Sequence, residues 1–393
     1  MANNEYILSS QKYKLVNRIA AWIVFLIAFT TYFLTIEPTV SFWDCGEFIS
    51  SSYKLEVGHP PGAPFFMLMA KFFSLFAPDV TKVAAMINTL SALMSALTIL
   101  FLFWSITHIA KRIIGDEKSL QLSNATAIFF AAAVGALAYT FSDTFWFSAV
   151  EGEVYASSSL FTALVFWAIL KWENIADKKY ANRWLIFIAY MMGLSIGVHL
   201  LNLLAIPAIV FVYYFRKYKP DTVGIIKAFV VSVFILGSVM YIIIPGVVWL
   251  ASRFELLFVN GFGLPYHSGA IFYFIALFGG LAYGIYYSIK KNRVLLNIVL
   301  TMITVIIIGY SSYALIIIRS NTNLPMDQNN PDNVFSLLSY LNRDQYGDNP
   351  LIYGQYYNSK PVAYVEKSPI YEMRNGKYVV VDHKLGYEFE PGS

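Results

Sequence analysis

Charged residues are scarce in this chain of 393 residues. Asp, Glu, Lys and Arg make up 13% of it, against about 25% in a typical soluble domain, whereas 58% of the residues are hydrophobic and the mean hydropathy is +0.57. Several apolar runs of about 18 residues or more could each cross a bilayer as a helix. The composition excludes an ordinary soluble globular fold and predicts an integral membrane protein.

Other absences narrow the function. A single cysteine, Cys45, excludes an internal disulfide framework. The sequence has no Gly-Lys-Ser/Thr phosphate loop, so ATP-driven transport is unsupported, and no Cys/His spacing typical of zinc. The net charge is only +4, with the basic residues in short clusters that flank apolar runs. This pattern does not indicate a nucleic-acid partner.

The apolar runs predict an all-α polytopic membrane protein with about nine spans. The region 184–215 is ambiguous because basic clusters flank both of its ends. One long helix would put these clusters on opposite sides of the membrane, whereas two short spans that turn near His199 and Asn202 keep them on one side, and we expect two. The expected spans are 19–36, 83–109, 124–141, 155–171, 184–199, 201–215, 224–250, 271–289 and 294–318.

The basic residues also predict an orientation. Seventeen of the 28 lysines and arginines lie in the N-terminal segment and in alternate loops, four lie in the opposite loops, and the rest lie in the tail from Arg319 onward. The positive-inside rule then places the N-terminus in the cytoplasm and the tail outside. On this map most loop acids and histidines gather on the outer face, which favours binding or chemistry there.

The composition suggests two parts. Residues 1–318 are expected to form the transmembrane module, with a long external loop at 37–82 that contains interfacial helices. Residues 319–393 are expected to form a small external α+β segment with short strands such as 378–381, and this segment could be incomplete.

The external loop carries the first candidate site residues. Asp44 and Glu47 are three residues apart, so a helix would place both on the same side, where one carboxylate can act as a base while the other orients an acceptor or a metal. His59 precedes two prolines that fix its position, and it could donate to a phosphate oxygen or orient a carboxylate. The alternatives are solvated acids on an interfacial helix and a histidine that merely shapes a turn.

Later loops add polar groups. Glu151 and Glu153 are two residues apart, so one of them is expected to face the site, and we favour Glu153 together with Tyr155; the alternative is a solvated loop. His199 and Asn202 could contact a ligand or could serve as hydrogen-bonding links between helices.

Two arginines are candidates for holding an anionic headgroup. Guanidinium groups suit phosphate geometry, which makes Arg253 and Arg319 substrate-binding candidates. For Arg319, at the end of the last span, a side chain that reaches to the membrane surface is the ordinary alternative.

Several sequence strings resemble a known family. These strings are Phe42–Phe48, Gly58–Pro64, Glu153–Tyr155, Gly193–Asn202 and Tyr340–Asp348. Together they resemble the bacterial membrane proteins of domain-of-unknown-function family 2723. That family is grouped with the multispanning glycosyltransferases of the GT-C type, and its animal relatives are protein O-mannosyltransferases.

The resemblance implies a GT-C fold and a polyprenyl-phosphate sugar as donor, with mannose as the expected sugar. It implies that Asp44 is the acid that serves the acceptor hydroxyl, with inversion at the sugar carbon. Many GT-C enzymes have two adjacent acids, but here the second, Glu47, is three residues on. The expected acceptor is a Ser or Thr hydroxyl of an exported protein; a glycolipid or cell-wall acceptor, or a non-enzymatic lipid or solute transporter, is the alternative.

The resemblance also implies a location. We expect a bacterial inner-membrane protein in contact with membrane lipid, with its active site and C-terminal segment in the periplasm. No certain cofactor is expected, and the sequence leaves a dependence on divalent metal open.

Overall fold

The structure is a computed structural model that describes residues 7–115, 119–347, 354–356 and 358–390. Among these residues, eight helices are long and apolar enough to cross a membrane. The mostly helical, multispanning fold predicted from the sequence is confirmed. The expected span at 184–199 is a helix of only 14 residues, Arg183–Ile196, shorter than the others. The eight candidate spans are Ser10–Leu34, Val80–Ile114, Leu122–Thr140, Val154–Ile175, Leu200–Lys217, Thr222–Gly261, Ser268–Lys290 and Val294–Ser320.

The chain divides into two compact units, which we describe separately. Unit 1 comprises Met1–Gly58, Ala63–Leu236 and Ile298–Tyr313. Its elements are β1 (Ile7–Ser9), α1 (Ser10–Leu34), α2 (Cys45–Lys54), α3 (Pro64–Ser74), α4 (Val83–Ile114), β2 (Ser119–Gln121), α5 (Leu122–Thr140), α6 (Asp143–Ala149), α7 (Val154–Ile175), α8 (Arg183–Ile196), α9 (Ile206–Lys217), α10 (Thr222–Gly237) and α13 (Val294–Tyr310).

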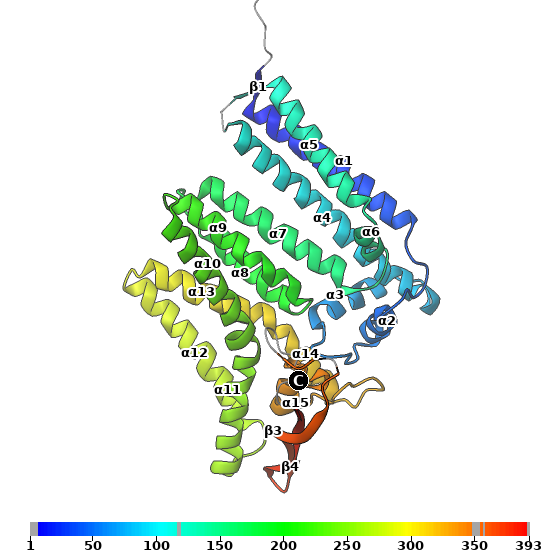
Figure 1. Cartoon of the computed structure of the whole chain (residues 1–393), viewed down its shortest axis with the longest axis vertical. Coiled ribbons are helices and arrows are strands. Elements are labelled where there is room, and N and C mark those ends of the chain that lie inside the picture. Colours follow the sequence, from blue (N-terminus) through cyan, green and yellow to red (C-terminus); the bar gives the residue numbers. More distant parts are fainter. Residues whose placement is uncertain (1–6, 116–118, 348–353, 357, 391–393) are drawn as a thin grey trace, which may run out of the picture. The chain divides into compact units, whose positions relative to one another are not determined.

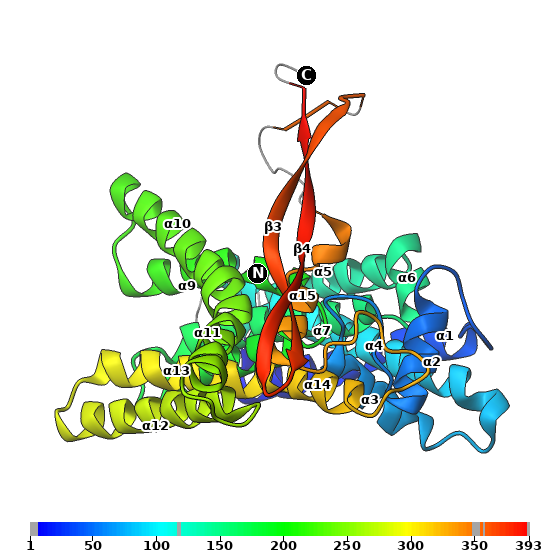
Figure 2. The same ribbon diagram turned by 90° about the horizontal axis from the view of Figure 1, so that it is seen from below.

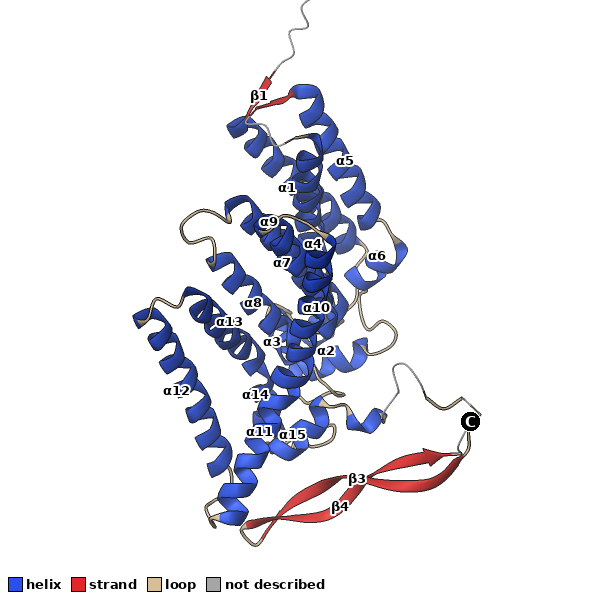
Figure 3. Ribbon diagram, turned by 60° about the vertical axis from the view of Figure 1, so that its left-hand side comes forward, coloured by secondary structure: helices blue, strands red, loops and turns tan. Residues whose placement is uncertain are grey.

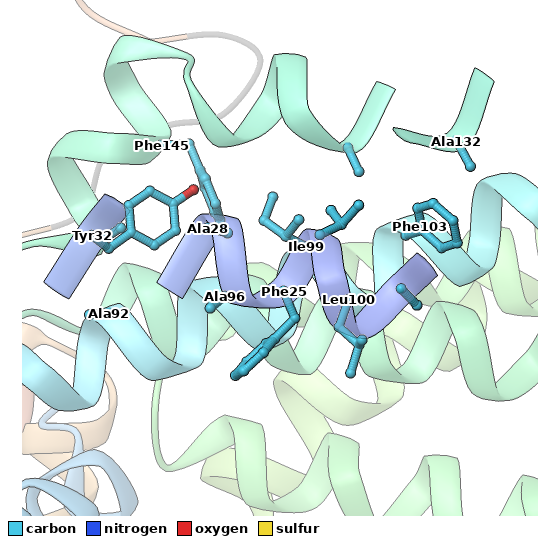
Figure 4. Close-up of a cluster of buried hydrophobic side chains, with 14 residues drawn as sticks. Phe25, Ala28, Tyr32, Ala92, Ala96, Ile99, Leu100, Phe103, Ala132 and Phe145 are labelled. Carbon is cyan, nitrogen blue, oxygen red and sulfur yellow. The ribbon is translucent and has the colours of Figure 1, made fainter. Parts of the chain in front are cut away.

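Helix α4 is the centre of unit 1. It packs against α1, α5 and α7, and α7 packs in turn against α8 and α9 (Figure 1). Small side chains, among them Ala92 and Ala96 of α4 and Ala132 and Ala136 of α5, lie fully buried in the core between α1, α4, α5 and α6 (Figure 4). Such small residues allow membrane helices to approach closely, because van der Waals packing drives their association.

The segment between α1 and α4 contains two short helices, as the sequence predicts for residues 37–82. Helix α2 ends at Leu55, which adopts the left-handed conformation, and α3 begins with Pro64 in its first turn, where proline is tolerated. Phe48 of α2 and Phe66 of α3 meet edge to face at 5.5 Å, in a core that also includes Ile87 of α4. Figure 2 shows both short helices beside α4. The loop is therefore fixed by packing to the start of α4.

The chain reverses direction between α8 and α9. Helix α8 ends at Ile196, and a 3-10 helix at Leu200–Ala205 leads into α9. Arg216 and Lys217, at the end of α9, both pair with Asp177, which lies between α7 and α8. The basic groups before α8 and after α9 therefore lie at the same end of unit 1. The predicted turn near His199 is confirmed.

Unit 2 comprises His59–Gly62, Gly237–Asn297 and Ala314–Ser393. The tail predicted to contain strands forms one long hairpin (Figure 3), and the predicted strand at 378–381 lies within its second strand. The elements of unit 2 are α11 (Ile244–Leu256), α12 (Ser268–Lys290), α14 (Ala314–Ser320), α15 (Val334–Leu341), β3 (Pro361–Arg374) and β4 (Lys377–Phe389), with π-helical turns at Ser238–Ile243 and Leu257–Gly261.

A buried carboxylate ties the hairpin to the helices of unit 2. Glu255 of α11 is fully buried and accepts hydrogen bonds from the backbone N–H groups of His267 and Ala270 and from the Tyr378 hydroxyl of β4. The last contact is 3.0 Å long. Because buried charge is stabilised only where it is fully hydrogen-bonded, we infer that Glu255 fixes the position of β4 against α11 and α12.

Two glycines let α8 and α13 cross at close range within unit 1. A Cβ atom on Gly193 would lie 2.5 Å from the backbone oxygen of Ile306, and one on Gly309 would lie 2.5 Å from the backbone nitrogen of Leu194. Backbone atoms cannot move aside as the end of a flexible side chain can. The crossing therefore requires glycine at both positions.

We predict that Gly193→Ala lowers the stability of the protein by about 1–3 kcal/mol, the usual effect of overpacking a well-packed contact. Thermal unfolding of the purified protein in detergent measures the effect. The control is Gly279→Ala in α12, where an added Cβ meets no atom within 4 Å, and this variant is expected to keep or slightly raise the unfolding temperature. Equal unfolding temperatures for the two variants would contradict the close crossing.

Candidate functional site

The starts of α2 and α7 bring polar side chains together at one end of unit 1. Asp44 directly precedes α2, and its side chain is exposed and makes no capping hydrogen bond to that helix. Trp43 before it adopts a positive φ of 60° and is 87% exposed, beside an exposed Phe42. Asp44 is therefore an accessible carboxylate flanked by two exposed aromatic rings.

A buried carboxylate lies beside Asp44. Glu151 is 4% exposed, and its Oε2 atom accepts a hydrogen bond from the Sγ of the buried Cys45 at 3.4 Å. Burial raises the pKa of Glu151, and the charge of Glu37 adds to this, while hydrogen bonds from Ser41 and Cys45 act in the opposite direction. Burial also raises the pKa of the Cys45 thiol, followed by the charge of Glu151. Cys45 is thus a neutral hydrogen-bond donor at neutral pH.

A second buried acid and two rings complete this end. Glu153 is 6% exposed and occupies the position before α7. Tyr155 is 44% exposed, and its ring meets that of His199 edge to face at 5.4 Å. The Tyr155 hydroxyl lies close enough to interact electrostatically with Glu153, Asp44 and Glu151. We call Asp44, Glu151, Glu153, Tyr155 and His199 the acidic cluster.

Glu47 and Asn88 support the backbone around the cluster. A Cβ on Gly58 would lie 2.5 Å from Oε1 of Glu47, so this carboxylate packs directly on the Gly58 backbone. Asn88 of α4 is fully buried and donates from Nδ2 to the carbonyl oxygens of Glu37 at 2.6 Å and Thr39 at 3.0 Å. These contacts hold the segment that leads to Asp44 against the start of α4.

Asn202 lies in a different environment from His199. It is fully buried, and its Nδ2 donates to Oγ of Ser195 at 2.7 Å and to Sδ of Met192 at 3.2 Å, both in α8. His199 accepts from the Leu201 backbone N–H at 3.2 Å through Nδ1. Asn202 thus links the turn to α8, whereas the ring of His199 reaches Tyr155.

Three of the predicted site residues belong to unit 2. His59 receives a hydrogen bond on its carbonyl oxygen from the Tyr340 hydroxyl of α15, at 3.3 Å. Arg253 of α11 is exposed and lies over the Trp249 ring, 5.2 Å from its centre. Arg319 is in the last turn of α14.

Sequence reasoning missed part of this environment. It favoured Glu153 over Glu151, but both are buried, and it gave Cys45 no role beside Glu151. It also missed Asn88, an uncharged residue within an apolar span. Asn88 interrupts that apolar run near the start of α4, and this polar residue is the signal that the sequence offers. The pairing of Cys45 with Glu151, 106 residues apart, could not be read from spacing.

Metal binding finds no support in the geometry of the described part of the chain. No group of three or more His, Cys, Asp or Glu side chains there is arranged to hold a metal ion.

These features define a multispanning membrane protein with an acidic cluster where the segment before α2 meets the start of α7. Residues 44–222 match the family described as the Protein O-mannosyl-transferase TMEM260 N-terminal domain. The match includes the whole acidic cluster and begins at Asp44. Residues 347–393 match a family of unknown function, DUF8416. No solved structure matches the chain.

Two curated relatives are distantly similar. The protein named Protein O-mannosyl-transferase tmem260 of Dictyostelium discoideum is 24% identical over 186 residues, which cover 46% of this chain and 21% of that protein. The Mus musculus protein named Protein O-mannosyl-transferase TMEM260 is 28% identical over 173 residues, covering 44% of this chain and 22% of the relative. The chain thus matches about a fifth of the length of each of these relatives.

We predict that Cys45 does not react with N-ethylmaleimide at pH 7.5 while the protein is folded, because the thiol is buried and its pKa is raised. The chain has one cysteine, so mass spectrometry reads the reaction directly. The control is Ser50→Cys in a Cys45→Ser background, on the exposed face of the same helix, which should label quickly. Rapid labelling of Cys45 without denaturant would contradict the site geometry.

Proposed function

We propose that this protein is an integral-membrane glycosyltransferase that moves a sugar, mannose in the simplest case, from a polyprenyl-phosphate donor to a Ser or Thr hydroxyl of an exported protein. Asp44 acts as the general base. As the acceptor oxygen attacks the sugar C1, its proton passes to the Asp44 carboxylate and the bond from C1 to the phosphate oxygen breaks. Attack opposite the leaving group inverts C1, and the polyprenyl phosphate departs with the bonding electron pair.

The observation that carries the proposal is the contrast between the carboxylates of the acidic cluster. Asp44 is exposed, whereas Glu151 and Glu153 are each more than nine-tenths buried. An exposed carboxylate can reach an acceptor hydroxyl arriving from water, and buried ones can position groups around it. The match to the O-mannosyl-transferase family over the same residues supports this assignment.

The neighbours of Asp44 suit a sugar and its lipid. Trp43 and Phe42 are exposed apolar rings at the end of a membrane span, where aromatic side chains commonly sit at the interface between lipid and water. Tyr155 and His199 present polar atoms for sugar hydroxyls. Glu47 is proposed to support the loop through Gly58, and it has no separate proton-transfer role.

The leaving phosphate needs positive charge. Arg253 and Arg319 are proposed for this role from the sequence alone, with His59 as an additional hydrogen-bond donor, because positioned charges stabilise a developing anion more than solvent does. Asn202 is proposed to act through the turn that holds His199, since its amide is bonded to α8.

We predict that Asp44→Asn lowers kcat by about 10²–10⁴-fold, the usual contribution of a general base, with a smaller change in KM. The assay uses purified protein, polyprenyl-phosphate mannose and a Ser/Thr peptide, with the glycopeptide measured by mass spectrometry. The control is Asp143→Asn, an equally conservative change at an exposed acid in the first turn of α6, which should leave the rate unchanged.

Three other outcomes would alter the proposal. Product formed only with a glycolipid acceptor would replace the protein acceptor and keep Asp44 as base. Equal loss in both variants would remove Asp44 from that role. Lipid scrambling or solute uptake that survives Asp44→Asn, with no glycosylated product, would overturn the enzyme in favour of a transporter.

We further propose that the acidic cluster faces the periplasm and the N-terminus faces the cytoplasm, in a bacterial inner membrane. Single cysteines in a Cys45→Ser background test this, since Ser50 lies at the cluster end and Lys178 at the other end of unit 1, both exposed. In intact cells with a permeable outer membrane, an impermeant maleimide should label Ser50→Cys, and should label Lys178→Cys only after lysis. The reverse pattern would invert the orientation.

A further inference from the structure

A cavity of about 450 Å³ lies at the end of unit 1 opposite the acidic cluster. It is open to solvent and is lined by the beginning of α1 and the C-terminal ends of α4 and α7, whereas Glu153 marks the other end of α7. Its size is within the range of small-molecule sites. The proposed transfer reaction makes no use of it.

Positive charges converge on this cavity from three helices. Lys14 and Arg18, one turn apart on α1, line it together with Lys111 of α4 and Lys171 of α7. Lys171 lies close enough to Lys14 and Arg18 for their positive charges to repel its own. Repulsion between like charges held this close destabilises the fold, and a bound anion would offset it.

Three of the four cations lack a carboxylate partner among the described residues. No carboxylate is among the residues that line the cavity. The nearest acid along α7, Glu173, is already engaged by His108 at 2.8 Å and by Arg112 at 2.5 Å. Lys14, Arg18 and Lys171 have no carboxylate within 4 Å among the residues that the structure describes.

The walls of the cavity suit a ligand at a membrane surface. Trp104 and Trp167 stack with ring centres 5.6 Å apart, and Lys171 lies 5.3 Å from the Trp167 ring centre. On the neighbouring turn of α1, Ile19 and Trp22 are about half exposed, as expected of side chains that contact lipid. A ligand whose charged group enters the cavity could therefore keep an apolar part in the adjacent bilayer.

We propose that this cavity binds a phosphate ester, with the phosphate of an anionic lipid headgroup as its source. Arg18 supplies a planar fork suited to phosphate oxygens, and the three lysines supply point charges around it. The exposed apolar turn of α1 favours a lipid over a soluble phosphate. The positive-inside rule explains an excess of basic residues at this end, but it does not require four of them to line one cavity.

Lipid binding to the purified full chain tests the proposal. Native mass spectrometry measures retention of phosphatidylglycerol against phosphatidylcholine, and a thermal shift with inorganic phosphate tests a soluble source. The cavity variant is Lys14→Gln/Arg18→Gln/Lys171→Gln. The matched control, Lys178→Gln/Lys179→Gln/Arg183→Gln, removes the same charges from exposed positions between α7 and the start of α8 that do not line the cavity.

The wild type and the control should prefer phosphatidylglycerol, and the cavity variant should lose about 100-fold in its affinity, as three basic side chains near an anionic headgroup imply. If the cavity variant loses the thermal shift with inorganic phosphate but keeps its affinity for phosphatidylglycerol, the site is assigned to a soluble phosphate ester. Equal losses in both triple variants, or no preference in the wild type, would overturn the proposal. If the triple cavity variant does not fold, the single variant Lys171→Gln should show an affinity for phosphatidylglycerol about fivefold lower than the wild type.

This test is independent of sugar transfer, because it reads binding at the opposite end of the helices from Asp44. An inactive Asp44→Asn protein should bind the anionic lipid as the wild type does.

Discussion

The low polarity of the bilayer is the constraint on which the rest of this structure depends. Charged groups are costly in hydrocarbon, so the long helices carry their ionisable side chains mainly at their ends. Helix α7 shows the result, because it has Glu153 before its first turn and Lys171 near its last. Helices α1 and α4 add cations to the end where Lys171 lies, with Lys14 and Arg18 near the start of α1 and Lys111 and Arg112 in the last turn of α4.

The acidic end is built by contacts between segments far apart in the chain. Cys45 of α2 bonds to Glu151, and Asn88 of α4 holds the backbone of residues 37–39. These bonds satisfy buried polar groups that would otherwise be strongly destabilising. They also fix the loop so that Asp44 remains exposed while the neighbouring acids Glu151 and Glu153 are buried.

Much of the fold followed from the sequence. Hydropathy predicted eight of the nine expected spans, whereas the ninth, at 184–199, is a shorter helix. The basic clusters correctly resolved the turn near His199. The sequence also predicted strand at 378–381, although as a short element and not within a long hairpin. These features depend on local composition, which a single sequence contains.

The remaining features depend on packing between distant segments. The close crossing at Gly193 and Gly309 and the cavity shared by Lys14 and Lys171 arise only when separate helices meet. Spacing alone also could not decide the burial of Glu151 and Glu153. Single residues such as Asp44 could be proposed from the sequence, but their neighbours could not.

The central claim is that the sugar donor reacts at the acidic end of unit 1. The most direct measurement is photo-crosslinking with a polyprenyl-phosphate sugar that carries a diazirine on the sugar, followed by peptide mapping. The account predicts adducts in peptides containing residues 42–48 and 153–155, reduced by unlabelled donor. The account would be contradicted if the adducts that unlabelled donor reduces lay only in peptides from the opposite end of α4 and α7, such as residues 104–111.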